Sequence, residues 1–333
     1  MNSTEWRRQL GVDVIPSLLS SGNEAVVYFT NRDLLDKPVA PIESVWQLPE
    51  SQKLLRKQQT DGSWPFTGKK TAVYPPEHHS LVETFKRFRL LVEKYQFNTG
   101  HTALANAAEY LFSFQTPEGD IRGFIGNQYA TYYTGYVLSL LIMAGYADDP
   151  RTEKGMRWLL AMRQNDGGWT VPILTHSYDR QTGYDLTSKY MDPVEPDRSK
   201  PFSHNWTDMV LRAFAAHPRY RDSGEAKAAG ALLKSQFFMP DAYTSYQAPS
   251  YWVRFGFWWP NLLTAMESLS LIGFPINDPD IKKGLDWFIV NQDVDGLWNV
   301  SYNKEKGFRN AKTIGEREWL SLRICRMLKR YFQ

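Results

Sequence analysis

The sequence predicts an all-α protein built from repeated helical hairpins. A turn of the form Asp-Gly-x-Trp occurs three times, at residues 61–64, 166–169 and 295–298. Amphipathic segments with helical spacing alternate with nearly all-apolar segments from residue 41 onward, and no long stretch shows the alternation typical of a strand. Recurrence of one unit along a chain is the signature of a repeat architecture.

The first 40 residues contain two helix-like segments, 12–19 and 23–35. Pro16 interrupts the first, because proline removes a backbone donor and restricts the chain. We expect residues 1–40 to form a helical segment of their own, either as a sixth hairpin or as a cap, and residues 41–333 to hold the repeats.

The clearest repeat relates residues 149–169 to residues 278–298. Asp-Pro, Lys-Gly, Trp, Asp-Gly and Trp recur in this order at a constant offset of 129 residues. Each copy is typical of one helix with an Asp N-cap and Pro at the first helical position. The glycine after the helix allows a left-handed turn, so the tryptophan can fold back over the helix end.

Glutamines precede these turns and mark the repeat length. Weaker copies add two glutamines, so that residues 59, 115, 164, 236 and 292 are separated by 56, 49, 72 and 56 residues. Each unit has room for two helices. The long step contains residues 170–202, which have little helical periodicity and are predicted to form a lid. The more apolar helices are predicted at 79–95, 129–145, 204–217, 257–273 and 315–331.

Composition excludes several classes of function. The net charge is +3 without a basic block, which disfavours a nucleic-acid partner. The single Cys325 excludes an internal disulfide and thiolate-rich zinc sites, and we expect neither a metal nor a cofactor. The longest apolar stretch, 136–147, is shorter than the roughly 20 residues of a membrane span. With no apolar block at the N-terminus, we expect a cytoplasmic protein.

Aromatic residues are unusually abundant, with 12 Trp, 18 Tyr and 18 Phe. Six rings fall within residues 251–260, before an apolar helix. Such a run can hold an apolar ligand, stabilise a cation, stack on sugars or contact a membrane surface. Packing within a hairpin core explains it equally well.

Residues 154–169 and 283–298 resemble the repeat motif of the terpenoid cyclase and protein prenyltransferase superfamily, which includes squalene-hopene cyclase. That motif runs basic-Gly, aromatic-aliphatic, Gln and Gly-x-Trp, and with degenerate copies the resemblance covers residues 41–333. It implies an α/α toroid, a closed ring of about six helical hairpins whose inner helices surround a cavity. It also implies a structural role for the repeat residues Gln59, Trp64, Gln164, Trp169, Gln292 and Trp298.

The catalytic signatures of that superfamily are incomplete in this chain. Class II cyclases carry an Asp-x-Asp-Asp box at the start of an inner helix, whereas residues 203–208 contain only Asp208. Protein prenyltransferases hold zinc with an Asp-x-Cys pair, and no acid stands two residues before Cys325. The sequence therefore leaves open whether the chain is an enzyme.

Candidate site residues are those near the starts of the inner helices and in the aromatic run. Asp208 and His204 lie four residues apart on one helix face and are the predicted catalytic pair, since histidine beside an acid can move a proton. Asp208 could instead interact only with the helix dipole. The predicted ligand-binding residues are His78, His79, Tyr132, Tyr133, Trp206, Trp252, Arg254, Trp258, Trp259 and Glu316.

Three functions remain in view. The first is an isoprenoid-handling protein with an apolar, aromatic cavity and acid-catalysed chemistry; its partner would be an apolar small molecule, with peripheral membrane contact as an option. The second is a non-catalytic lipid-binding or protein-binding toroid. The third is a carbohydrate-active lyase or hydrolase, in which Tyr133, His204, Asp208 and Arg254 would form a polar cleft.

Overall fold

The computed structural model describes residues 5–69, 74, 76–243, 248–256, 259–302 and 311–333. Within these ranges every regular element is a helix, and the only β contacts are two isolated bridges. The predicted all-α class, with the hairpin repeat of α/α toroids, is confirmed. Across the same ranges, none of the helices combines the length and the apolar character needed to cross a membrane.

The chain forms two compact units, which we describe separately. Unit 2, Pro49–Leu232, contains three helical hairpins and the segment inserted into the third. The first helices of these hairpins are α5 (Pro49–Leu55), α7 (Thr102–Phe112) and α9 (Pro150–Ala161). The second helices are α6 (Pro76–Tyr95), α8 (Thr131–Leu141, continued by the π-helix η2, Ile142–Tyr146) and α11 (His204–Ala216).

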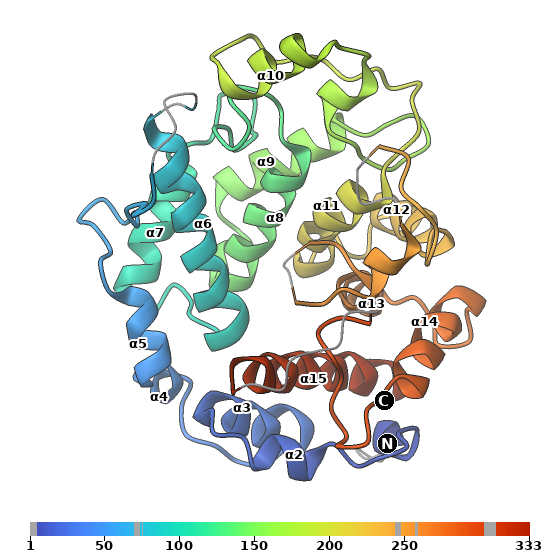
Figure 1. The fold of residues 1–333 in the computed structure, drawn as a ribbon. Helices are drawn as coiled ribbons and strands as arrows, with labels where there is room; N and C mark the ends of the chain where they lie inside the picture. Colours follow the sequence, from blue (N-terminus) through green and yellow to red (C-terminus); the bar gives the residue numbers. More distant parts are fainter. Residues whose placement is uncertain (1–4, 70–73, 75, 244–247, 257–258, 303–310) are drawn as a thin grey trace. The chain divides into compact units, whose positions relative to one another are not determined.

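Helix α8 forms the middle of unit 2, packed against both α6 and α11 (Figure 1). Nearly all of its side chains are buried, as its continuous apolar sequence predicts. Gly135 allows this packing, because a Cβ atom there would lie 2.6 Å from the Cα atom of Val210 on α11. The two helices therefore approach with their backbones almost in contact.

Unit 1 combines residues Met1–Leu48 with Leu233–Gln333. Its N-terminal elements are α1 (Glu5–Arg8), α2 (Ile15–Leu19), α3 (Glu24–Phe29), the π-helix η1 (Thr30–Leu34) and α4 (Glu43–Trp46). Its C-terminal elements are the 3₁₀ helix η4 (Pro249–Val253), α13 (Leu262–Ile272), α14 (Pro279–Val290) and α15 (Ala311–Phe332). Helix α12 (Gly224–Ser235) begins in unit 2 and ends in unit 1.

The repeat tryptophans make the same two hydrogen bonds in each copy. The indole Nε1 of Trp64, Trp169 and Trp298 donates to the carbonyl oxygen of the residue ten positions earlier, at 3.0, 2.7 and 2.7 Å. The backbone N–H of each tryptophan donates to a hydroxyl on the second helix of the same hairpin. These hydroxyls belong to Thr84, Thr207 and Ser321, and the weaker copy at Ile121 uses Thr134.

In the first two hairpins of unit 2 a glutamine links the hairpin to the next one. The side chain of Gln58 donates to the carbonyl oxygens of Gly62 and Ala103, at 3.0 and 2.7 Å. Gln115 makes the equivalent pair of bonds to Gly119 and Arg151. Because both acceptors are backbone carbonyls, the amide group fastens a turn to the following helix without requiring a particular side chain there.

The glutamine that makes these bonds differs from the predicted one in the first copy, and in the other strong copy of unit 2 the predicted glutamine has different partners. The bonds predicted for Gln59 are made by Gln58, which stands six residues before its tryptophan, as Gln292 does. The Gln59 side chain is exposed and donates to the carbonyl of Lys57. In the second copy Gln164 is one place late, so its side chain bonds to the insertion, at the carbonyls of Asp197 and Lys200.

Residues 1–40 are bound to the last repeat within unit 1. Gln292 donates to the carbonyl of Val12 and accepts the N–H of Val12, at 2.8 and 3.0 Å. Ser17 donates to the carbonyl of Asp295, and Lys329 of α15 forms an ion pair with Asp36. Gln292 thus bonds to the N-terminal segment, whereas Gln58 and Gln115 bond to the next hairpin.

The insertion at residues 170–202 contains more helix than its sequence pattern predicts. It holds the 3₁₀ helix η3 (Pro172–Thr175) and α10 (Arg180–Ser188). The N-cap Asp179 accepts the N–H groups of Gln181 and Thr182, which explains why a helix starts there. Its predicted action as a lid stays a prediction.

The two adjacent glutamines of the first repeat give a matched test of the clasp. We expect Gln58→Ala to lower the free energy of unfolding by about 1–3 kcal/mol, because two partly buried carbonyls lose their donor. Gln59→Ala should change it by less than about 0.5 kcal/mol. Urea unfolding followed by circular dichroism checks this. Equal effects of the two substitutions would contradict the assignment.

Candidate functional site

Aromatic rings from three elements of unit 2 meet where α8 begins. Tyr132 contacts both Tyr133 and Trp206, with ring centroids 4.5 and 4.4 Å apart. Tyr133 stacks on Phe124 at 4.0 Å, and Phe85 of α6 meets Tyr133 edge-on at 5.5 Å. We call Phe85, Phe124, Tyr132, Tyr133, Tyr136 and Trp206 the aromatic cluster.

The repeat turns position this cluster. The hydroxyl of Thr131, the first residue of α8, donates to the carbonyl of Thr170, which directly follows the repeat tryptophan. Ser203 caps α11 by accepting the N–H of Trp206, and its own N–H donates to the carbonyl of Trp169. The starts of α8 and α11 are thus both fastened to the turn at 166–170, which brings Tyr132 and Trp206 together.

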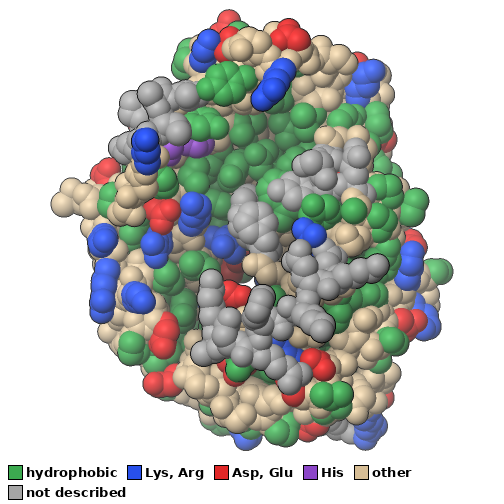
Figure 2. All heavy atoms as spheres, viewed as in Figure 1, with side chains coloured by type: hydrophobic (Ala, Val, Ile, Leu, Met, Phe, Trp, Pro, Cys, Tyr) green, Lys and Arg blue, Asp and Glu red, His purple; other side chains and the backbone are tan. Residues whose placement is uncertain are grey.

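Hydrophobic side chains line a hollow on this face of unit 2, with histidine side chains at its margin (Figure 2). Five of the six rings of the cluster are buried, including Tyr132 with 8% exposure. The sixth, Tyr133, is half-buried. Burial raises the pKa of Tyr133 to about 12 and raises that of Tyr132 well above its usual value. Both phenols therefore stay protonated in an apolar environment.

A buried chain of polar side chains runs behind the cluster. Asp208 forms an ion pair with Arg212 at 2.7 Å, and its side chain is only 1% exposed. The guanidinium of Arg212 lies 4.7 Å from the ring centre of Tyr136, whose hydroxyl donates to Glu93. Glu93 in turn pairs with Arg89 at 3.3 Å, so opposite charges alternate across α6, α8 and α11.

Asp208 has a neighbour that the sequence analysis did not select. Its carboxylate accepts a hydrogen bond from Arg212, one turn after it, and the predicted pairing with His204, one turn before it, stays a prediction. Both residues of the predicted pair are buried within unit 2. An ion pair with arginine is strongest when the carboxylate carries its charge.

The two predicted histidines lie at the start of α6, beside the cluster. His78 Nδ1 is 2.9 Å from the carbonyl oxygen of Gly123, the residue before Phe124. Burial lowers the pKa of His78, an effect that the bond to Gly123 opposes and the charge of His79 reinforces. The side chains of the two histidines are half-buried.

The remaining predicted residues belong to unit 1. Trp252 is buried against Phe237, and its indole N–H donates to the carbonyl of Met239 at 2.9 Å. The guanidinium of Arg254 lies 4.3 Å from the ring centre of Tyr251. Trp259 and Glu316 are half-buried, and Trp258 lies outside the described residues. The polar set of the carbohydrate hypothesis is thus divided, with Tyr133, His204 and Asp208 in unit 2 and Arg254 in unit 1.

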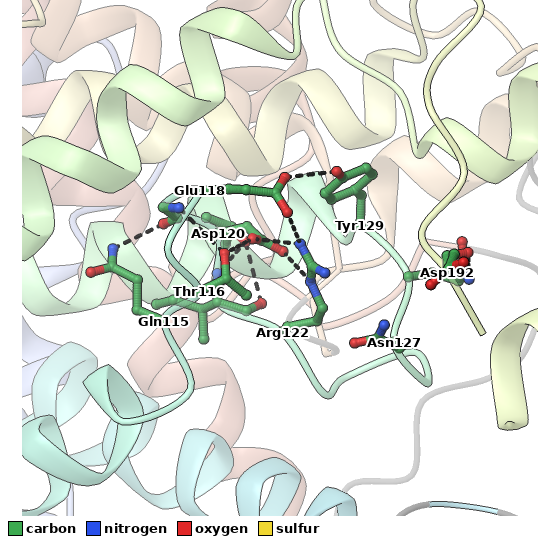
Figure 3. Close-up of polar contacts among 12 residues, drawn as sticks. Gln115, Thr116, Glu118, Asp120, Arg122, Asn127, Tyr129 and Asp192 are labelled. Carbon is green, nitrogen blue, oxygen red and sulfur yellow. Dashed lines mark hydrogen bonds and ion pairs between the residues drawn. The ribbon is translucent and has the colours of Figure 1, made fainter. Parts of the chain in front are cut away.

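The sequence analysis missed the polar residues that fix the loop before α8. Figure 3 shows Arg122 between the carboxylates of Asp120 and Glu118, at 2.9 and 3.2 Å. Glu118 also accepts the hydroxyl of Tyr129 at 2.7 Å, and Thr116 donates to the fully buried Asp120. Two acids placed four and two residues before an arginine in a Gly-containing turn are the signal that could have revealed this group.

This loop group supports the aromatic cluster directly. Arg122 stands immediately before Gly123 and Phe124, which contact His78 and Tyr133. The loop also holds the insertion, because Gln128 donates to the carbonyl of Asp192 and accepts the N–H of Val194. The insertion, the histidines and the cluster are therefore connected through residues 118–129.

Comparison with known proteins agrees with the repeat motif. Residues 63–189 match the family model of the squalene-hopene cyclase C-terminal domain. The matched segment contains α6 to α10, and with them five of the six rings of the cluster, its supporting loop and both histidines. Over these residues the chain is similar to that family, in agreement with the repeat motif.

Several solved structures are also similar to this chain. A protein from Actinoplanes is 16% identical over 88% of each chain, with a TM-score of 0.45. A variant of the type II terpene cyclase MstE from Scytonema, in complex with geranylgeranyl dihydroxybenzoate, is 12% identical over 95% of this chain and 98% of the other, with a TM-score of 0.44. Another MstE variant, in complex with merosterolic acid A, is 14% identical over 95% and 97%, with a TM-score of 0.42.

The raised pKa of Tyr133 predicts a loss of stability in alkali. The unfolded phenol ionises near its usual pKa of 10, whereas the folded one stays protonated to about 12. The contribution of this phenol to the free energy of unfolding is therefore complete below pH 10 and is lost as the pH rises through 12. We expect Tyr133→Phe to make the unfolding free energy fall less steeply in this range. An unchanged slope, measured by urea unfolding at each pH, would contradict the burial of this phenol.

Proposed function

We propose that this chain binds an isoprenoid, or a similarly apolar chain, on the aromatic cluster of unit 2 and stabilises positive charge there. The observation that carries the proposal is the convergence of Tyr132, Tyr133 and Trp206 from α8 and α11 at 4.4 to 4.5 Å. Ring faces attract cations without reacting with them, and they offer apolar area to an alkene chain. The match to a cyclase family model over this segment supports the same reading.

We assign the catalytic roles to Asp208 and His204. The Asp208 carboxylate, held by Arg212 at 2.7 Å, supplies a buried negative charge on the helix that carries Trp206. Such a charge stabilises a developing cation, because a preorganised site in a low dielectric needs little rearrangement. His204, one turn earlier on the same face, is the group that we propose to transfer a proton.

A non-catalytic binder is the second candidate. The ion pair of Asp208 with Arg212 favours it, because a carboxylate engaged in this way is a poor proton donor. In that case the charged chain across α6, α8 and α11 would only hold the three helices together, and the cluster would bind its ligand without changing it.

Two buried tryptophans of unit 2 give a matched test of binding. Trp206 on α11 and Trp158 on α9 are each 6% exposed, and only Trp206 belongs to the cluster. We expect Trp206→Leu to weaken binding of geranylgeraniol by at least about tenfold through the loss of ring contact. Trp158→Leu should lower the melting temperature and leave the affinity within about twofold. Isothermal titration calorimetry checks this. Equal losses of affinity would exclude the cluster as the site.

A substitution at Asp208 separates the enzyme from the binder. If Asp208 stabilises a cation, Asp208→Asn should reduce turnover of a prenyl substrate by about 100-fold or more and leave substrate affinity within a few fold. Product is measured by gas chromatography, and the melting temperature shows that the variant is folded. Turnover unchanged in a folded variant would remove Asp208 from the mechanism.

A further inference from the structure

The two histidines of α6 form a distinct group within unit 2. Their rings are 5.3 Å apart and nearly perpendicular. His78 stacks on Tyr74 at 4.4 Å, and His79 stacks on Phe66 at 4.8 Å. Each imidazole is therefore held between apolar rings, which fixes its orientation.

The bond of His78 to Gly123 determines which nitrogen of that ring can accept. A carbonyl oxygen only accepts hydrogen bonds, so Nδ1 of His78 carries the hydrogen. In the neutral ring, Nε2 is then an acceptor. Burial and the neighbouring His79 both favour the neutral ring by lowering the pKa of His78.

His79 presents the complementary atom. Its Nε2 is buried, and among the described residues no group forms a hydrogen bond with it. A buried nitrogen without a partner is unfavourable, so such atoms normally meet water or a ligand. The pair thus offers an acceptor on His78 and, in the Nε2–H form of His79, a donor.

The histidine pair adjoins the aromatic cluster through two consecutive residues. Gly123 binds His78, and Phe124 stacks on Tyr133 at 4.0 Å. The nearest arginine in the loop, Arg122, is already paired with Asp120 and Glu118. The aromatic cluster therefore adjoins a small polar group whose neighbouring arginine is already paired with acids.

We propose that His78 and His79 bind the hydroxyl end of an isoprenoid alcohol whose chain lies on the aromatic cluster; this inference rests on the proposed function. The ligand hydroxyl donates to Nε2 of His78 and accepts from Nε2 of His79. A hydroxyl group suits this pair because it both donates and accepts. A diphosphate offers acceptors only, so it would leave Nε2 of His78 facing another acceptor.

The test compares three probes, which are geranylgeraniol, the hydrocarbon in which a methyl group replaces its hydroxyl, and geranylgeranyl diphosphate. We expect the wild-type chain to bind the alcohol about tenfold more tightly than the hydrocarbon, because the polar atoms of the site are satisfied only by the alcohol. In His79→Phe, which keeps a ring against Phe66, this preference should fall to about twofold with hydrocarbon affinity unchanged. His101→Asn is the control, since it removes an imidazole elsewhere in unit 2 and keeps an N-cap acceptor on α7.

The outcomes distinguish this inference from the function on which it rests. Equal binding of alcohol and hydrocarbon by the wild type would overturn the hydroxyl site and leave the isoprenoid proposal standing. Tighter binding of the diphosphate than of the alcohol would do the same. Binding of none of the three probes would overturn the isoprenoid proposal itself.

Nitrogen-15 NMR of the histidines provides a readout that does not depend on a variant. We expect His78 to carry its hydrogen on Nδ1, and its Nε2 resonance to move when geranylgeraniol is added but not when the hydrocarbon is added. A hydrogen on Nε2 of free His78 would overturn the proposed acceptor.

Discussion

The backbone N–H of each repeat tryptophan is buried and must find an acceptor. In three copies the acceptor is a hydroxyl on the second helix of the same hairpin, and a fourth copy with isoleucine uses the same arrangement. The need for this hydrogen bond fixes the position of the second helix, along its axis, relative to the turn. Since Thr207 lies one residue after Trp206, the bond that satisfies a backbone donor also sets the height of a ring in the aromatic cluster.

The general plan follows from the sequence because its signals are local. Asp149 and Asp278 cap helices that begin with proline, and both do so through their carboxylate oxygens in the structure. The second helix of each hairpin can be predicted because its burial requires an apolar sequence over many turns. The sequence analysis selected Gln59 instead of Gln58 because the two glutamines stand side by side before the first turn. Only their spacing from the tryptophan distinguishes them.

The candidate site was only partly predictable. Tyr132, Tyr133 and Trp206 follow from the rule that second helices begin near one another, whereas Phe85 and Phe124 come from positions that the rule does not mark. The partner of Asp208 could not be chosen from spacing, because His204 and Arg212 are both four residues away on the same face. The guanidinium of Arg212 also lies over the ring of Tyr136 on α8, a contact between helices that spacing along one helix does not reveal.

The bonds between Val12 and Gln292 have a consequence for the order in which the chain matures on the ribosome. Unit 2 is one continuous stretch and can complete its contacts while synthesis is still in progress. The N-terminal segment is synthesised before its partners, which lie 280 residues later. Its apolar side chains therefore lack these partners until the last repeat has been made.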